Sequence, residues 1–144
     1  PTATLALTPN MNYMSAPPDE QLNLVYNAVD VGINTADGEG WGLVPFEHAQ
    51  TRKAQVVPNH TSSADIWKDS AELIDVGAWV TDKDLGVERG LIDYKHAAEL
   101  LNKLYEDEEY RKKVADKCFE TTQNPSYRWD KVAEGFCKAM EVLK

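Results

Sequence analysis

Apolar residues lie along this chain in short runs that alternate with helical stripes. The runs are predicted strands, and they cover residues 3–8, 31–35, 54–57 and 71–76. The stripes have apolar side chains three and four residues apart, which predicts helices. They cover 19–29, 94–105, Asp107 to Asn124, and about Arg128 to 143. Two shorter helices are predicted from the signals at their starts, one from Pro45 with its neighbours to about Thr51 and one over 62–68. Strands that alternate with helices form βαβ units, so we expect an α/β fold with a Rossmann-like parallel sheet covered by helices on both faces.

Local signals predict how several of these elements begin and end. Pro45 falls in the first turn of its helix, where a missing N–H costs nothing. Ser62 and Asp65 have the spacing of a capping box. Asp107 is placed to cap a helix that the Asn124-Pro125 pair then ends. Residues 77–92 are acidic and contain glycines, so we expect an irregular surface loop there.

Composition and charge limit the classes of function. The chain has 144 residues and a net charge of −9, which predicts one acidic domain over 1–144 that does not bind nucleic acid. The final helices, 94–143, are expected to pack on the sheet. Cys118 and Cys137 are expected to be buried free thiols, which indicates a reducing compartment. The chain opens on Pro1, so we expect a domain that is incomplete at its N-terminus.

The segment with candidate chemistry lies between the strand at 31–35 and the helix around Pro45. Three glycines at positions 38, 40 and 42 allow the backbone to approach a ligand closely. They precede a helix start, where free N–H groups favour a phosphate or diphosphate. Glu39 and Glu47 flank the same place, and because carboxylates repel phosphate they are suited to sugar hydroxyls. The helical rise puts Glu47 roughly 6–8 Å beyond the helix start, about the offset from a diphosphate to a ribose.

Two interpretations of this segment stay open on spacing alone. It can be a sugar-nucleotide site, or an ordinary glycine turn with two surface glutamates. It matches neither G-x-x-x-x-G-K-[ST] nor G-x-G-x-x-G. In parallel sheets the ligand site lies at the carboxyl ends of the strands. The loops that follow 31–35 and 54–57 are therefore the expected position of a site.

The stretch E-G-W-G-L-V-P-F-E, from Glu39 to Glu47, resembles the Glu-x7-Glu signature of retaining glycosyltransferases of the GT-B fold. It is most similar to glycosyltransferase family four, also called group 1, and to the C-terminal donor-binding domain of that family. The likeness extends over about residues 5–143. Its further parts are the run at 24–35, His48-Ala49, Gln55 to Pro58, the leucine pair and acidic helix start at 100–110, and Trp129 to Ala133.

The resemblance implies a role for each matched position. Glu39 would be the catalytic residue that contacts the hydroxyls of the donor sugar, and Glu47 would bind the ribose. Backbone N–H groups would meet the sugar and diphosphate at Gly40, Trp41, Gly42 and Leu43. The Trp41 ring is a candidate wall of the sugar pocket. Residues expected near the base or the phosphates are Asn10, Met11, Asn12, Tyr13, His60 and Thr61.

Two departures from the family pattern bear on these roles. The family often carries two glycines after the strand at 54–57, whereas this chain has Asn59-His-Thr-Ser-Ser63, for which both phosphate binding and helix capping stay open. The family also uses an Arg and Lys pair on an earlier strand–helix unit, and the sequence has no counterpart. Charge stabilisation of a leaving diphosphate is a large catalytic contribution. We therefore expect this chain alone to transfer little or no sugar.

The resemblance implies a function in carbohydrate biosynthesis. The chain would be the donor-binding part of an enzyme that moves a hexose, such as mannose or glucose, from a GDP- or UDP-hexose to an acceptor hydroxyl. The alternative is a non-catalytic nucleotide-sugar-binding or interaction module of the same fold. The acceptor-binding N-terminal domain would be a partner outside this chain, and the location cytoplasmic, with membrane docking through that domain. No metal cofactor is expected, and the Asp82-Lys-Asp84 string is treated as a chance match.

Overall fold

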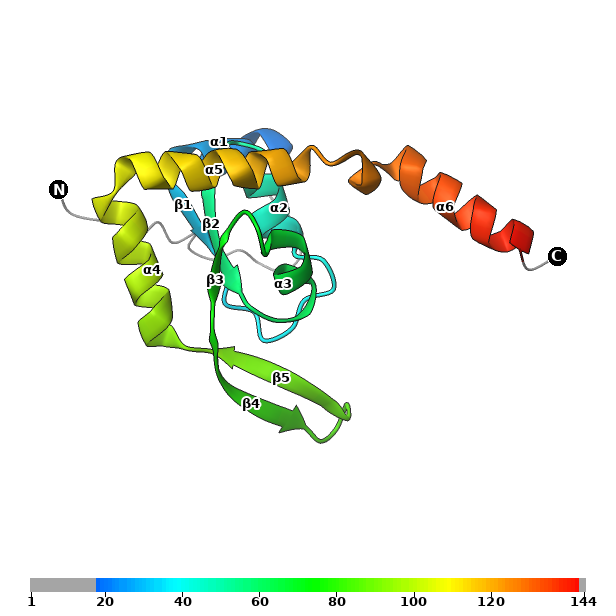
Figure 1. The fold of residues 1–144 in the computed structure, drawn as a ribbon, viewed down its shortest axis with the longest axis horizontal. Coiled ribbons are helices and arrows are strands. Elements are labelled where there is room, and N and C mark those ends of the chain that lie inside the picture. Colours follow the sequence, from blue (N-terminus) through cyan, green and yellow to red (C-terminus); the bar gives the residue numbers. More distant parts are fainter. Residues whose placement is uncertain (1–17, 143–144) are drawn as a thin grey trace.

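A sheet of three parallel strands lies at the centre of the structure (Figure 1). The computed structural model describes residues 18–142, so the predicted strand at 3–8 and the candidates at 10–13 lie outside the described residues. The strands are β1 (Val31–Ile33), β2 (Ala54–Pro58) and β3 (Glu72–Ile74), in the order β1-β2-β3. Their register pairs Gly32 with Gln55 and Val57 with Leu73. The parallel pairing expected from the alternating pattern is confirmed.

Helices connect the strands and follow them. The chain enters β1 from α1 (Asp19–Ala28), and α2 (Leu43–Ala49) and α3 (Thr61–Trp67) make the crossovers to β2 and β3. After the sheet come α4 (Tyr94–Glu106), α5 (Glu108–Thr122), the short 3-10 helix η1 (Pro125–Tyr127) and α6 (Trp129–Val142). The sequence predicts each of these α-helices, α2 and α3 from the signals at their starts and the others from apolar spacing. The fold class is therefore α/β with a Rossmann-like sheet, as expected.

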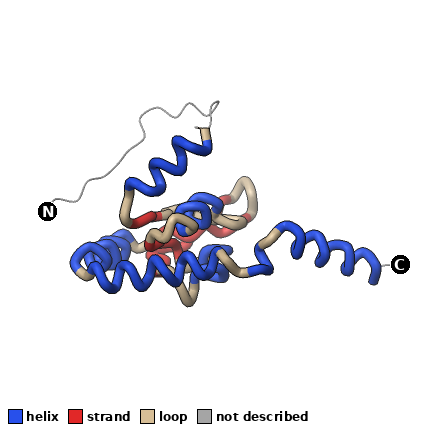
Figure 2. The backbone as a smooth tube through the Cα atoms, turned by 90° about the horizontal axis from the view of Figure 1, so that it is seen from above, coloured by secondary structure: helices blue, strands red, loops and turns tan. Residues whose placement is uncertain are grey.

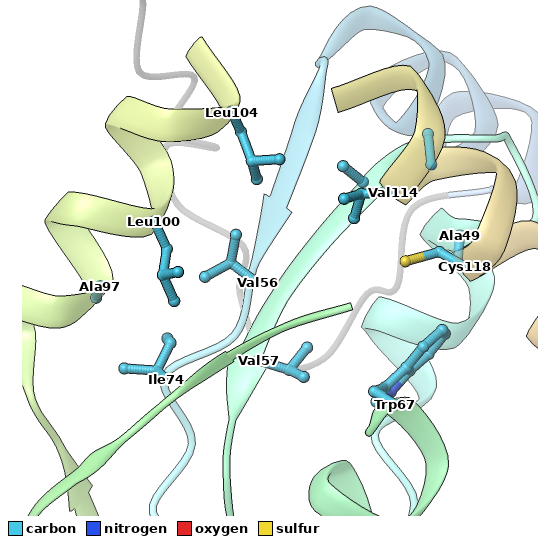
Figure 3. Packing of buried hydrophobic residues seen from close by; sticks show 12 residues of the cluster. Ala49, Val56, Val57, Trp67, Ile74, Ala97, Leu100, Leu104, Val114 and Cys118 are labelled. Carbon is cyan, nitrogen blue, oxygen red and sulfur yellow. The ribbon is translucent and has the colours of Figure 1, made fainter. Parts of the chain in front are cut away.

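The core forms on both faces of β2, whose five residues are all buried. Side chains alternate between the two faces of a strand. Figure 3 shows Val56 directed toward Leu100 of α4, and Val57 directed toward the side where Trp67 and Cys118 lie. Both faces of the sheet are thus covered by helices.

The predicted helix caps are confirmed at one position and wrong at another. The Asp107 carboxylate accepts a hydrogen bond from the Tyr110 N–H at 2.8 Å, which caps α5 as expected. No side chain caps α3, so the capping box at Ser62 and Asp65 is wrong. The Ser62 hydroxyl instead donates to the Glu39 carbonyl at 2.8 Å. The Ser62 hydroxyl, which the local sequence pattern assigned to the helix cap, is therefore used in a tertiary hydrogen bond.

The segment 77–92 is not an irregular loop but an antiparallel hairpin. Strands β4 (Val76–Asp82) and β5 (Val87–Ile92) pair in it (Figure 1). The Asp82 carboxylate accepts from the N–H groups of Asp84 and Leu85, both at 3.1 Å, and Gly86 turns the chain at φ 66°. Acidic and glycine residues that favoured a loop are thus the residues that build the turn.

Helices α4 and α5 contact the sheet, whereas α6 extends away from it beyond the end of α5 (Figures 1 and 2). No residue of α6 is buried. The expectation that the final helices pack on the sheet is therefore wrong for α6. The expectation of two buried thiols is also wrong in part, because Cys118 is buried and Cys137, on α6, is exposed.

Candidate functional site

The loop after β1 and the start of α3 meet beyond the carboxyl ends of β1 and β2, and Glu39 lies at their junction. The Glu39 N–H donates to Thr61 Oγ1 at 3.2 Å. The Glu39 carbonyl accepts from Ser62 Oγ at 2.8 Å and from the Ser62 N–H at 3.4 Å. Both polar groups of the Glu39 backbone are therefore held by the first turn of α3. This is the edge of a parallel sheet at which ligands bind.

Asn34 orients the loop and contacts the carboxylate of Glu39. Its N–H continues the ladder by donating to the Val56 carbonyl at 2.9 Å. Its side-chain oxygen accepts from the Ala36 N–H at 2.8 Å, and its side-chain amide lies 3.4 Å from Glu39 Oε1. Such a local turn is common for Asn after a strand. A weak neutral partner of this kind leaves the carboxylate able to accept further hydrogen bonds.

The glycine loop that ends at α2 presents backbone N–H groups. Within residues 18–142, no hydrogen bond uses the N–H groups of Gly40, Trp41, Gly42 or Leu43. Gly42 has φ 83°, in the left-handed region that glycine adopts without strain. The loop leads directly into α2, which has seven residues.

Glu47 lies on α2, exposed, and pairs with α1. Its Oε2 accepts a hydrogen bond from the Tyr26 hydroxyl at 3.0 Å. Partial burial raises the pKa of Tyr26 to about 12, with further contributions from this hydrogen bond and from the Glu47 charge. The next residue, His48, stacks on the Tyr26 ring at 5.2 Å, and its Nε2 lies 3.0 Å from the Tyr26 carbonyl. Burial lowers the pKa of His48. Helix α1 thus fixes the side chain of Glu47.

The Trp41 side chain packs against protein. Its ring lies 5.4 Å from the Phe46 ring and 5.0 Å, edge-on, from the Tyr127 ring of η1. About a third of Trp41 is exposed (36%). The aromatic cluster of Trp41, Phe46 and Tyr127 connects the glycine loop to the segment before α6.

His60 and Thr61, the expected base or phosphate residues, contact protein as well. The His60 ring is buried, lies 5.8 Å from the Trp79 ring, and would be 2.7 Å from a Cβ on Gly90. The absence of a side chain at Gly90 therefore makes room for His60 under the hairpin. The Thr61 hydroxyl oxygen accepts a hydrogen bond from the Glu39 N–H.

Within the described part of the chain, no group of three or more His, Cys, Asp or Glu side chains is arranged to hold a metal ion. Asp82, the first residue of the D-x-D string, instead binds Arg89 at 3.1 Å and closes the hairpin turn. None of the helices between residues 18 and 142 combines the length and apolar character that a membrane crossing requires.

Sequence reasoning missed several residues that organise this site. They are Tyr26, Asn34 and Arg89. Asn34 carried a usable signal, because Asn directly after a strand favours a side-chain turn. Tyr26 and Arg89 carried none, because they reach the site from elements distant in sequence.

Comparison with solved structures identifies the class to which this fold belongs. Sucrose-phosphate synthase (tll1590) from Thermosynechococcus elongatus is similar with a TM-score of 0.64 and 15% identity, over 86% of this chain and 28% of that chain. The C-terminal domain of a glycosyl transferase group 1 family protein (LpcC) from Francisella tularensis is similar with a TM-score of 0.59 and 16% identity, over 77% of this chain and 50% of that chain. The fold is that of the C-terminal domain of group 1 GT-B glycosyltransferases.

No protein-family model and no curated protein sequence matches the chain. The chain spans about a quarter of the first similar structure and half of the second. At such identities the likeness shows the fold alone, which agrees with the fold that the sequence resemblance implied.

Proposed function

We propose that this chain is the donor-binding domain of a retaining glycosyltransferase of family four, which transfers a hexose from a nucleoside diphosphate to an acceptor hydroxyl. The observation that carries the proposal is the placement of Glu39. On this fold it lies at the carboxyl edge of the sheet, its backbone held by Thr61 and Ser62. Among the described residues 18–142, the one hydrogen-bond partner of its carboxylate is a neutral amide, that of Asn34 at 3.4 Å.

The division of the donor between the two acids follows from their chemistry. Gly40 to Leu43 offer N–H groups without acceptors in the described chain, which suits diphosphate oxygens. Glu39, at one end of these amides, would accept hydrogen bonds from sugar hydroxyls. Glu47, on the helix that follows, would accept them from the ribose. A GDP- or UDP-hexose has this order of groups, and neither a metal nor a cofactor is part of the proposal.

Calorimetric titration with UDP, GDP, UDP-glucose and GDP-mannose tests the proposal. Glu47→Ala should weaken free nucleotide and nucleotide sugar alike, because the ribose is common to both. Glu39→Ala should weaken only the nucleotide sugar, by about tenfold for a charge-assisted hydrogen bond. Glu88→Ala, at an exposed position on β5, is the matched control and should change neither. Equal loss of both ligands in Glu39→Ala contradicts the role of Glu39.

A non-catalytic nucleotide-sugar-binding module is the second candidate, and one observation favours it. Arg89, the cation bound to the glycine loop, is ion-paired with both Asp37 and Asp82. Its charge is therefore already compensated and is poorly suited to stabilise a leaving diphosphate. Donor binding without release of nucleoside diphosphate, when acceptor and the N-terminal half of a related enzyme are supplied, would favour this candidate.

A further inference from the structure

We propose that Thr61 is a positioning residue that sets the place of Glu39, and that its unfavourable backbone conformation is retained for this purpose. The inference rests on the proposed function, because it concerns the sugar end of the donor. Thr61 has φ 51°, in the left-handed region. A β-branched residue is an outlier there, since its Cβ substituents crowd the backbone. Such strain persists where surrounding contacts require it.

The contacts of Thr61 show what requires it. Its Oγ1 accepts from the Glu39 N–H at 3.2 Å and lies 3.3 Å from His60 Nδ1. The following residue, Ser62, donates its N–H and its hydroxyl to the Glu39 carbonyl. Thr61 and Ser62 thus bind the N–H and the carbonyl of Glu39, which lies in the opposite loop. The turn at Thr61 places Ser62 within hydrogen-bond distance of the Glu39 carbonyl.

Neither core packing nor helix capping accounts for the strained backbone of Thr61. Core packing does not require it, because Thr61 is exposed. Helix capping does not require it either, because the N-cap residue of α3 is His60 and no side chain caps the helix. The hydroxyl of Thr61 is used on Glu39, in a different loop. The strain is therefore tied to the loop that carries the candidate catalytic residue.

A pair of substitutions separates positioning from ordinary structural support. Thr61→Gly removes the hydroxyl and relaxes the backbone, because glycine adopts this φ freely. We expect its melting temperature to equal or exceed that of the parent chain. Its affinity for UDP-glucose or GDP-mannose should fall about fivefold, the loss of one hydrogen bond, while UDP and GDP bind as before. Thr61→Ser keeps the hydroxyl and should restore the parent affinity.

The control is Thr122→Ala, which removes a threonine hydroxyl bonded to a backbone carbonyl, that of Phe119 at 2.7 Å on α5. It should leave the affinity for all four ligands unchanged. The proposal is overturned if Thr61→Gly binds nucleotide sugars like the parent chain, or if it loses all four ligands equally and melts earlier. If Glu39→Ala is sugar-selective and Thr61→Gly is not, this inference alone fails. If the parent chain binds none of the four ligands, the proposed function fails with it.

Discussion

Arg89 and Asp37 are 52 positions apart in the sequence, yet Arg89 Nη1 donates to both carboxylate oxygens of Asp37, at 3.1 and 3.2 Å. Beside this pair, the Gly90 N–H donates to the Asp37 carbonyl at 3.0 Å. The hydrogen bond with Asp82 and the interactions with Asp37 raise the pKa of Arg89, so its charge persists at all ordinary pH values. These hydrogen bonds connect β5 to Asp37, at the start of the glycine loop.

The first prediction concerns the ion pair between Arg89 and Asp37. Arg89→Met and Asp37→Asn should each weaken nucleotide-sugar binding about threefold, because a freer loop holds Glu39 less well. The double variant should lose little more than either single one, since both remove the same contact. Calorimetry with UDP-glucose and GDP-mannose measures the cycle.

The control for this cycle is Arg52→Met, which breaks an exposed ion pair with Asp116 on α5. This substitution should leave the affinities for UDP-glucose and GDP-mannose unchanged. Fully additive effects of the Arg89 and Asp37 substitutions would show that the pair does not act as a unit.

The second prediction concerns Tyr26, whose pKa is raised from 10.0 to about 12. The folded chain holds the phenolic proton more tightly than the unfolded chain, so this contribution to stability is complete below pH 10 and is lost as pH rises toward 12. Absorbance titration of the folded chain should show a phenol ionising near pH 12 that Tyr26→Phe removes. Glu47→Gln should move that step to lower pH, because the Glu47 hydrogen bond and charge contribute to the shift after burial.

Tyr26→Phe also tests the role of Glu47 in binding. The loss of the hydroxyl frees the Glu47 carboxylate, so nucleotide and nucleotide sugar should weaken together, about threefold. A loss confined to the nucleotide sugar would contradict the assignment of Glu47 to the ribose.

The third prediction concerns His48, whose pKa burial lowers from 6.5. Because the folded chain resists protonation of this ring, the contribution of His48 to stability is complete above pH 6.5 and is lost as pH falls below it. The ring resonance of His48 in proton NMR should titrate below pH 6.5. The melting temperature should fall as the pH decreases from 6.5 toward the lower pKa of His48 in the folded chain. Titration of His48 at or above pH 6.5 would contradict its burial under Tyr26.

The fourth prediction concerns the two thiols. Cys118 is buried against the sheet, and burial raises its pKa to about 12, so the reactive thiolate is scarce. Cys137 is exposed on α6. A disulfide-exchange reagent should label Cys137 at once and Cys118 only after denaturation. Cys137→Ser should abolish labelling of the folded chain, and rapid labelling that persists in this variant would show that α5 does not bury Cys118 against the sheet.

The sequence was sufficient where a feature depends on local periodicity. The buried run at 54–57 became the central strand, and the stripe with Leu100 and Leu104 became a helix that covers it. Asp107 could be identified as a cap because a cap bonds to residues a few positions along.

Features that depend on distant partners could not be predicted in this way. The same acids and glycines that suggest a loop at 77–92 also build a hairpin turn, and only cross-strand pairing distinguishes the two. Ser62 has the pattern of a helix cap, but its hydroxyl donates to the Glu39 carbonyl, 23 positions away in the sequence. The apolar spacing of α6 predicts a buried face, yet spacing does not say what covers it. The two glutamates of the motif were found from sequence, and Thr61 was found with a different role, whereas Tyr26 and Asn34 were not found.

The central claim is that a nucleoside-diphosphate sugar lies along the loop from Glu39 to Leu43, with its ribose at Glu47. Backbone amide chemical shifts of the full chain, recorded during titration with UDP-glucose and GDP-mannose, test this most directly. The account predicts saturable shifts concentrated at Gly40 to Leu43 and around Glu47, and additional shifts at Glu39 and Thr61 that UDP or GDP alone does not produce. Absence of shifts with every ligand, or shifts centred away from this edge of the sheet, would contradict it.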